Sequence, residues 1–348
     1  MIESYEKYYV FRKFRALANV CKFKSPTIIC ACGFEPRSYK ILELIDSENV
    51  EGDVSLLVAD LTGEASPGDP YSQKAAPMIK QNRERFRALA ETKGFKCEFL
   101  PTKFYDESAE YAGHTEICER IQQIKFSPNS DDVILDISSM PRAMMFPVFS
   151  QVYKSCPNSQ NLFVTFTEIA IGSKESQVIS YWKPQWLPGF APKTQLGEAK
   201  ISIWLPILGF DYRRVEEILR AFKFDEIFPI VGFPSLRPLE TDSIVRAHKV
   251  LFDVYKVPFR SIIYAPMQDP FQLAIQMNRL VHDAVPRSDG TQVVISPFGS
   301  KPQSLGACLM ALHNDNVALL AVWPKSYDPQ AARSTDSYVY WIKGKIYE

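Results

Sequence analysis

Short, nearly continuous apolar runs alternate along the chain with segments in which apolar residues recur at helical spacing. Residues 27–33 read TIICACG, and the segment FEPRSYKILELI that follows has apolar residues three and four positions apart. A continuous apolar run is typical of a strand buried on both faces, whereas the second spacing is typical of an amphipathic helix. Repeated alternation of this kind predicts an α/β fold, with mostly parallel sheets and helices on both faces.

The strand–helix pattern occurs twice. Residues 203–209 read IWLPILG and are followed by FDYRRVEEILRAF, so that the segment GFEPR (33–37) matches GFDYR (209–213). Three further pairs match in the same order: GFKCEFLPTKFYD (94–106) with VPFRSIIYAPMQD (257–269), DDVILDISSMPRAM (131–144) with TQVVISPFGSKPQSL (291–305), and SQVISYWK (176–183) with SYVYWIK (337–343). Four colinear matches predict an internal duplication that produces two tandem Rossmann-like domains.

The domain boundary is expected near residue 190. We expect residues 1–190 to form the first Rossmann-like domain and residues 191–348 the second, with the Pro- and Gly-rich stretch 183–200 as the linker. The strands predicted for the first copy lie near 27–32, 54–60, 96–101, 132–137, 161–167 and 176–182. Those predicted for the second copy lie near 202–208, 227–232, 259–264, 292–296, 317–323 and 337–342.

The turn after the first strand of each copy carries a glycine, an acid and an arginine. Ligands of open parallel sheets bind beyond the carboxyl ends of the strands, where the strand order reverses. Either the acid pairs locally with the arginine at the start of the helix, or the turn contacts a ligand. The candidate residues are Gly33, Glu35 and Arg37 in the first copy and Gly209, Asp211 and Arg213 in the second.

The turn after the fourth strand of the first copy combines a carboxylate, two hydroxyls and a cation. These residues are Asp136, Ser138, Ser139 and Arg142. Hydroxyls, a guanidinium and the N–H groups of a helix start all favour a phosphate, and a carboxylate can hold a ribose hydroxyl or orient the arginine. The second copy keeps a hydroxyl and a cation in Ser300 and Lys301 but lacks the carboxylate, so the two halves are expected to be functionally unequal.

At this turn the chain resembles the CRISPR-associated Rossmann-fold (CARF) family and related double-domain sensors of prokaryotic antiviral defence. The segments VILDISSMPRAM and VVISPFGSKPQSL carry the resemblance, although the glycine pair usual in the family's turn is absent. The resemblance implies that the two copies act as an internal pseudo-dimer that holds a cyclic or linear oligonucleotide, or another nucleotide. Asp136, Ser138, Ser139 and Arg142, together with Ser300 and Lys301, would then bind the ligand.

The charge balance, the apolar stretches and the cysteines of the sequence disfavour non-specific nucleic-acid binding, a membrane span and disulfide bonds. Forty basic and forty acidic side chains cancel, so no global positive field favours non-specific nucleic-acid binding. No stretch has the length of a membrane span, and the seven cysteines lie mostly in apolar runs, so we expect a cytoplasmic protein with reduced thiols. Glycine fingerprints for a cofactor and ligand spacings for a metal do not occur, and we expect neither group.

Three functions are compatible with these features of the sequence. The first is a sensor or regulatory subunit that binds a nucleotide or small anionic ligand, with an effector protein partner and an oligomer both left open. The second is a phosphoester- or nucleotide-processing enzyme that uses Asp136 with a further acid such as Glu35, Asp60 or Glu168. The third is a scaffold that binds a partner protein through Trp182, Trp186 and Trp204, which we expect to be exposed.

The segment 60–94 admits two interpretations. It begins after a strand and enters a predicted helix that carries Arg83, Arg85 and Arg87. It is either a lid over the ligand site or an ordinary long loop, and Arg83 and Arg87 are expected to share one helix face.

Overall fold

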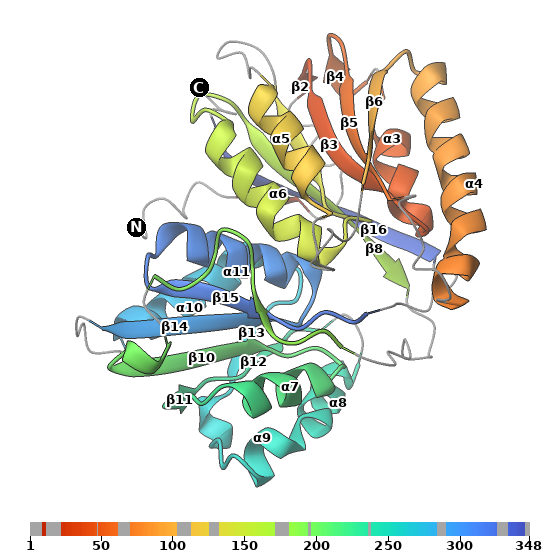
Figure 1. The fold of residues 1–348 in the computed structure, drawn as a ribbon. Helices are drawn as coiled ribbons and strands as arrows, with labels where there is room; N and C mark the ends of the chain where they lie inside the picture. Colours follow the sequence, from red (N-terminus) through yellow and green to blue (C-terminus); the bar gives the residue numbers. More distant parts are fainter. Residues whose placement is uncertain are drawn as a thin grey trace. The chain divides into compact units, whose positions relative to one another are not determined.

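The structure is a computed structural model that describes residues 9–11, 22–46, 48–61, 70–102, 113–124, 132–170, 181–193, 196–235, 238–283, 290–325 and 333–344. It contains two large sheets, each built mainly from parallel strands and flanked by helices (Figure 1). The predicted α/β, Rossmann-like fold class is therefore confirmed. Within the described residues, no helix is both long and apolar enough to cross a membrane.

The first sheet has the strand order β1-β16-β8-β7-β3-β5-β6. Neighbouring strands from β8 to β6 pair in parallel, while β16 is antiparallel to β8 and β1 is antiparallel to β16. The parallel strands thus lie in the chain order 3-2-1-4-5, which reverses between β3 and β7. The bounds are β1 (Tyr9–Phe11), β3 (Thr27–Cys32), β5 (Ser55–Asp60), β6 (Lys96–Pro101), β7 (Val133–Asp136), β8 (Leu162–Ala170) and β16 (Arg333–Lys343).

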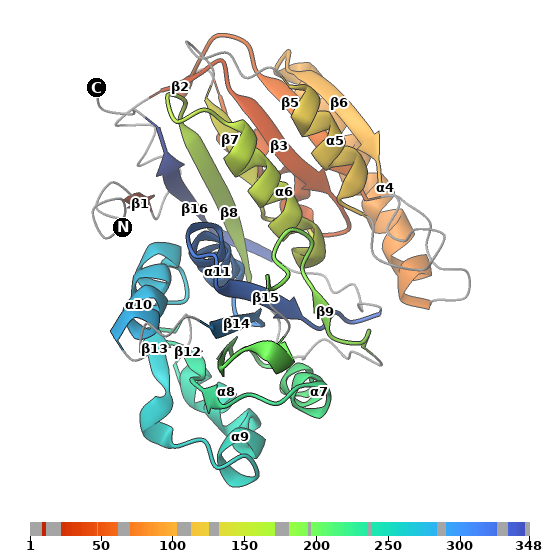
Figure 2. The ribbon, with the colours of Figure 1, turned by 60° about the vertical axis from the view of Figure 1, so that its left-hand side comes forward.

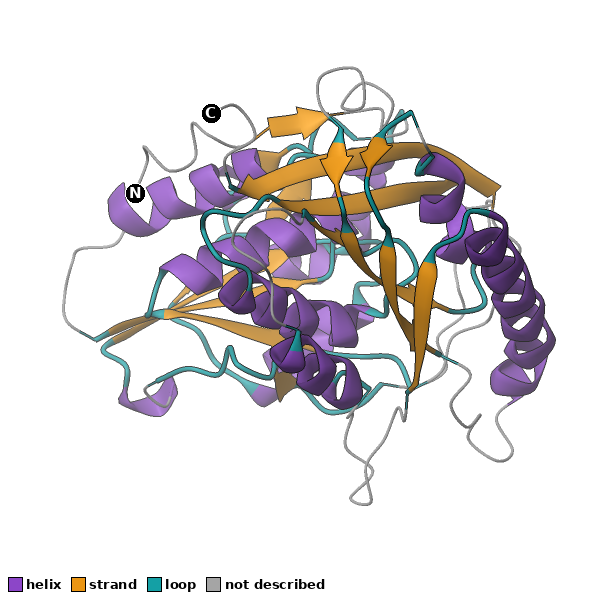
Figure 3. Cartoon of the chain, turned by 90° about the horizontal axis from the view of Figure 1, so that it is seen from above, coloured by secondary structure: helices purple, strands orange, loops and turns teal. Residues whose placement is uncertain are grey.

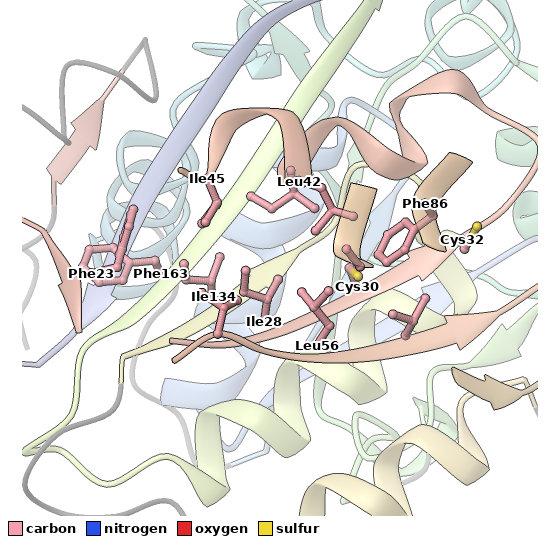
Figure 4. Close-up of a cluster of buried hydrophobic side chains, with 14 of the residues drawn as sticks. Phe23, Ile28, Cys30, Cys32, Leu42, Ile45, Leu56, Phe86, Ile134 and Phe163 are labelled. Atoms are coloured by element: carbon pink, nitrogen blue, oxygen red, sulfur yellow. The ribbon is translucent and has the colours of Figure 1, made fainter. Parts of the chain in front are cut away.

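Helices cover both faces of the first sheet (Figures 1 and 2). The 3-10 helix η1 (Pro36–Tyr39), α3 (Lys40–Leu44) and α4 (Pro70–Thr92) lie on one face, and α5 (Thr115–Gln123) and α6 (Arg142–Ser155) lie on the other. Figure 4 shows the core on the first of these faces, where Leu42 and Phe86 lie above Ile28, Cys30 and Leu56. These strand residues alternate along β3 and β5, as burial of one strand face requires.

The second sheet repeats this plan with the order β13-β12-β10-β14-β15-β9. Again the parallel strands follow the chain order 3-2-1-4-5, and β9 pairs with β15 in antiparallel orientation. The bounds are β9 (Gln185–Trp186), β10 (Ile201–Ile207), β12 (Ile230–Gly232), β13 (Ile263–Ala265), β14 (Thr291–Pro297) and β15 (Val317–Ala321), with β11 (Glu226–Ile227) beside β10. Equal strand order in the two sheets is what an internal duplication predicts.

The helices of the second sheet also follow the plan of the first. Figure 3 shows the helices and strands of the described chain in separate colours. Apolar residues of α7 (Arg213–Ala221), α8 (Glu240–Ala247) and α9 (Lys249–Asp253) share one core with β10 and β14. The two remaining helices, α10 (Pro270–Asp283) and α11 (Lys301–His313), pack against each other.

The predicted boundary at residue 190 differs from the observed division of the chain. One compact unit, here the first unit, comprises Glu6–Val178 with Ser326–Glu348, and the second unit contains Ile179–Lys325. The strand predicted at 337–342 for the second copy is part of β16, which pairs with β8 of the first sheet. The predicted linker contains β9, which pairs with β15 of the second sheet. The two sheets have therefore exchanged their antiparallel strands.

Side-chain burial explains this exchange. Val339 and Trp341 of β16 belong to the core of the first unit, and Leu187 and Phe190, which follow β9, are buried. The strand predicted near 176–182 lies outside the described residues except for its last two positions, where Tyr181 bridges to Pro324. The strand predicted at 259–264 is also corrected, since the 3-10 helix η3 (Phe259–Ser261) precedes the short β13.

Candidate ligand-binding site

The turn after β3 is fixed by hydrogen bonds within the first unit. Ser38 accepts a hydrogen bond at Oγ from the backbone N–H of Gly33 (3.0 Å) and donates to the carbonyl of Glu35 (2.7 Å). The side-chain amide of Asn82, on α4, donates to the carbonyls of Gly33 (2.9 Å) and Glu35 (3.1 Å). The backbone of this turn is therefore held in place from both sides.

Arg37 pairs with Glu35 and also reaches the end of β8. Its Nε donates to Glu35 Oε2 at 2.8 Å, and its Nη1 donates to the carbonyl of Thr167 at 2.9 Å. The side chains are only 7% and 20% exposed, and the guanidinium lies 5.6 Å from the centre of the Phe166 ring. Of the two interpretations of the GFEPR turn, local pairing is the one that the geometry favours for these two residues.

The residues after β7 form a buried polar cluster. Asp136 accepts hydrogen bonds at Oδ1 from the hydroxyls of Ser138 (2.5 Å) and Thr165 (3.0 Å). Ser138 in turn accepts from the backbone N–H of Thr167 at 2.8 Å, while the Ser139 hydroxyl donates to the carbonyl of Ala31 in β3. The Ser139 bond joins the β7 turn to strand β3, and Ser138 and Arg37 of the two predicted turns both bond to the backbone of Thr167. These turns therefore lie near each other where strand order reverses.

Thr165 and Thr167 complete this cluster, and we did not predict them. They occupy alternate positions in β8, so both hydroxyls lie on one face of the strand, and Thr167 Oγ1 lies 2.8 Å from Ser337 Oγ of β16. Their signal in the sequence was the alternation of threonine with apolar residues in LFVTFTE (162–168). Threonine is also a common strand former, so the pattern alone did not distinguish the two roles.

Arg142 is the cation of this turn and begins α6. Its side chain is half-buried, unlike those of Asp136, Ser138 and Ser139, which are buried. Pro141 precedes it as the N-cap and provides no side-chain capping hydrogen bond. Arg142 is therefore the most accessible of the four candidate residues at this position.

Two of the three acids considered as partners of Asp136 form ion pairs with arginines. Glu35 pairs with Arg37, and Asp60, at the end of β5, pairs with Arg83 of α4 at 3.0 Å. Asp60 lies on β5 and Asp136 lies on β7, which are the two neighbours of β3. The two carboxylates are therefore separated by two strand spacings, which together amount to about 10 Å across the sheet. Within the described residues, no group of three or more potential ligand residues could hold a metal ion.

Burial and nearby acids suppress ionisation of the thiols on β3. Burial raises the pKa of Cys32 to about 12, and the carboxylate of Asp60 contributes to this increase. The pKa of Cys30 is also raised, first by burial and then by Asp136. Neither thiol is therefore a thiolate at neutral pH, and a nucleophilic role for them is not supported.

The arginines of α4 face aromatic rings. Arg83 and Arg87 both lie over the Phe99 ring, at 5.7 and 4.7 Å from its centre, so the expectation that they share a helix face is confirmed. Arg85 lies over Tyr39 and pairs with Glu43. The part of the segment 60–94 for which a lid was considered, residues 62–69, is outside the described residues.

In the second unit, the turn after β10 is packed against the end of β14. A Cβ atom at Gly209 would lie 2.3 Å from the carbonyl oxygen of Phe298, so packing alone explains this glycine. Asp211 accepts hydrogen bonds from the Tyr181 hydroxyl (2.6 Å), Arg214 Nε (3.2 Å) and Arg213 Nε (3.4 Å). Burial and the bond to Asp211 raise the pKa of Tyr181, which remains a hydrogen-bond donor.

The hydroxyl of Ser300 is also used within the protein. It accepts a hydrogen bond from the backbone N–H of Gln303 (3.2 Å) and donates to the carbonyl of Met267 (2.5 Å). Gln303 Oε1 accepts from the Ser300 N–H at 2.9 Å, which completes a capping box at the start of α11. Lys301, at the first position of α11, is half-buried. The two fourth-strand turns therefore differ in how the helix that follows is capped.

One of the tryptophans assigned to the scaffold interpretation is not exposed. Trp204 is fully buried in the second core, where it stacks on Phe224 and donates to Ser296 Oγ at 2.9 Å. The expectation that it is exposed is wrong because it lies inside β10, a strand buried over nearly its whole length. Trp182 and Trp186 are half-buried.

Comparison with known proteins gives little further information. No family model matches the chain, and no curated protein matches it. Among solved structures, the chain is matched to PlmKR1, a ketoreductase from the first module of phoslactomycin biosynthesis in Streptomyces sp. HK803, with 9% sequence identity and a TM-score of 0.20. The match covers 77% of this chain and 49% of that chain, so it spans about half the length of the ketoreductase. At this TM-score it supports no conclusion about fold or activity.

Proposed function

We propose that the protein is a ligand-binding sensor or regulatory subunit whose first unit binds a phosphate of a nucleotide or oligonucleotide. The observation that carries this proposal is that both the β3 turn and the β7 turn bond to the backbone of Thr167, through Arg37 and Ser138, at the place where strand order reverses. This is the position at which open α/β sheets bind their ligands.

The internal hydrogen bonds separate the candidate residues that hold the strands and turns in place from the one assigned to contact the ligand. Asp136, Ser138 and Ser139 hold the ends of the strands in register, and Arg37 fastens the β3 turn to β8. Arg142 supplies the positive charge at the start of a helix of 14 residues, where backbone N–H groups and the helix dipole favour an anion. We therefore assign phosphate contact to Arg142 and positioning roles to the other residues.

The difference between the two fourth-strand turns favours the first unit. The start of α11 is closed by the Ser300–Gln303 capping box, whereas the N-cap of α6 is a proline, which offers no side-chain acceptor to the first N–H groups. Lys301 therefore ranks behind Arg142 as a phosphate contact. The resemblance of the β7 turn to CARF domains supports a nucleotide as the ligand and a role in prokaryotic antiviral defence.

Calorimetric titration of a mononucleotide, a linear oligonucleotide and a cyclic oligonucleotide into the protein tests this assignment. Arg142→Ala removes a charge-assisted hydrogen bond worth about 1.5–3 kcal/mol, so affinity for the bound probe should fall about ten- to a hundredfold. Lys301→Ala should have a smaller effect. Arg220→Ala is the matched control, because Arg220 is an exposed arginine on α7 that pairs with Glu216 and Glu217.

Two outcomes would count against the proposal. If none of the three probes binds, and mass spectrometry of the purified protein detects no nucleotide, the nucleotide assignment fails. If a probe binds but Arg142→Ala and Arg220→Ala have equal effects, with both variants folded by circular dichroism, the site lies elsewhere.

A further inference from the structure

The carboxyl edge of the second sheet exposes aromatic rings from neighbouring strands. Phe210 follows β10, Phe233 follows β12, and Tyr264 lies on β13, and these side chains are 41%, 59% and 50% exposed. All of the large hydrophobic side chains that are exposed among the described residues belong to the second unit. Such side chains on a protein surface commonly mark a binding site.

Strand pairing places the Phe233 and Tyr264 rings side by side. Phe210 follows the adjacent strand β10, whose last residue, Ile207, pairs with Ile230 of β12. The backbone N–H of Phe233 donates to the carbonyl of Ala265 at 2.8 Å, which continues the ladder between β12 and β13. The Phe233 and Tyr264 rings are in edge-to-face contact with their centres 6.2 Å apart.

Two half-buried aromatic rings lie near the carboxyl end of β15, at the other end of the strand order from β13, and each has a cation over its face. The Arg213 guanidinium lies 5.4 Å from the centre of the Tyr181 ring, and the Lys325 ammonium lies 5.0 Å from that of Trp182. Trp182 donates its backbone N–H to the carbonyl of Trp323, just after β15. The carboxyl edge of the second sheet thus carries a set of aromatic side chains, here called the aromatic row, with cations beside the last two: Tyr264, Phe233, Phe210, Tyr181 and Trp182.

We propose that this aromatic row binds the unpaired bases of a single-stranded nucleic acid. Every base has a π-face that stacks on an aromatic ring regardless of sequence, and nearby cations attract the phosphates that connect the bases. A protein partner would also bury aromatic rings, but the Lys325 ammonium beside Trp182 attracts the phosphates of a polyanion, as does Arg213 beside Tyr181, which also pairs with Asp211. The inference goes beyond the phosphate site of the first unit and does not depend on Arg142.

Fluorescence anisotropy with a labelled twelve-nucleotide oligothymidylate, added to the full-length protein, tests the proposal. Stacking of one base contributes enough that Phe233→Ala and Tyr264→Ala should each weaken binding about fivefold or more. Phe233→Trp should retain binding, because tryptophan also stacks on bases. Affinity should fall as salt concentration rises, and a duplex of the same length should bind more weakly.

The control variant is Tyr255→Ala. Tyr255 is 43% exposed and follows α9, where the chain returns to the amino edge of the sheet, away from the aromatic row. Failure of the probe to bind would overturn the inference, as would equal weakening by Tyr255→Ala and Phe233→Ala. Self-association of the protein that Phe233→Ala abolishes, without binding of the probe, would assign the row to a second copy of the chain instead. Phe233→Ala should weaken binding of the oligothymidylate but leave the calorimetric titration of a mononucleotide unchanged, which separates this test from that of the phosphate site.

Discussion

Alanine at the two equivalent glycines, Gly33 and Gly209, should have very different effects on stability. A Cβ atom at Gly209 would lie 2.3 Å from the carbonyl oxygen of Phe298 and 3.1 Å from its carbonyl carbon, so backbone at the end of β14 would have to move. At Gly33 the nearest atom is Cδ1 of Leu61, at 3.0 Å, which is the end of a side chain that can rotate.

These distances set the expected magnitudes. Overpacking costs about 1–3 kcal/mol and more when backbone must shift, while loss of glycine's freedom in the unfolded chain returns about 0.4–1 kcal/mol. We therefore expect Gly209→Ala to reduce the free energy of unfolding by about 2 kcal/mol or more, and Gly33→Ala to change it by less than about 1 kcal/mol. For a unit of this size, 2 kcal/mol corresponds to a fall of about 4–8 °C in the melting temperature.

Thermal unfolding monitored by circular dichroism and calorimetry would measure the difference. Calorimetry can also resolve the transitions of the two units, and the Gly209→Ala effect should fall on only one of them. Equal melting temperatures for the two variants would refute the packing explanation of Gly209. A larger loss for Gly33→Ala would show that the β3 turn, not the β10 turn, is the tightly packed one.

Three further predictions follow from contacts elsewhere in the molecule. Arg37→Ala removes the guanidinium that bonds to the half-buried Glu35 and to the carbonyl of Thr167 and should cost about 2–4 kcal/mol of unfolding free energy, whereas Arg220→Ala, at an exposed pair, should cost less than about 1 kcal/mol; similar losses in urea unfolding would contradict this. The pKa of Cys32 is raised to about 12 in the folded protein. The contribution of the neutral thiol to the free energy of unfolding is therefore fully present below about pH 8.5 and is lost as pH rises through about 12. Iodoacetamide at pH 8.5 should therefore alkylate the exposed Cys97 before Cys32, as peptide mass spectrometry would detect, and equal rates would argue against burial of Cys32. Deletion of residues 326–348 removes β16 and the bonds from Lys343 to the carbonyls of Tyr153 and Cys156, so the melting transition of the first unit should be lost; an unchanged transition would show that β16 is dispensable.

The sequence was most informative where one strand is buried on both faces. The run at 27–32 coincides with β3, and the run at 292–296 lies within β14, because continuous apolar character reflects burial of the strand itself. Trp204 was misjudged because its position near a presumed linker outweighed its place in such a run. Its side chain is fully buried, as the surrounding pattern indicates.

Pairing at the outer strands could not be predicted in the same way. The Tyr-Trp match between 181–182 and 340–341 identified equivalent positions in the two copies, but equivalence does not specify which sheet a strand joins. That choice depends on tertiary packing, here of Val339 and Trp341 in the first core. Likewise, parallel order predicted that Asp136 and Gly33 lie at one edge, but the hydroxyls of Thr165 and Thr167 could not be assigned without the backbone of β8.

Because β9 and β16 each join the sheet of the other copy, the two units complete their sheets at different times during translation. Parallel strand β8 emerges before the second unit, yet the strand that covers its outer edge, β16, is translated only after residue 332. Until then β8 presents unpaired N–H and C=O groups, which invite pairing with another chain. By contrast, every strand described for the second sheet has emerged once residue 321 is translated. We therefore expect the internal unit to mature first, and nascent first units to depend on protection from aggregation during the interval.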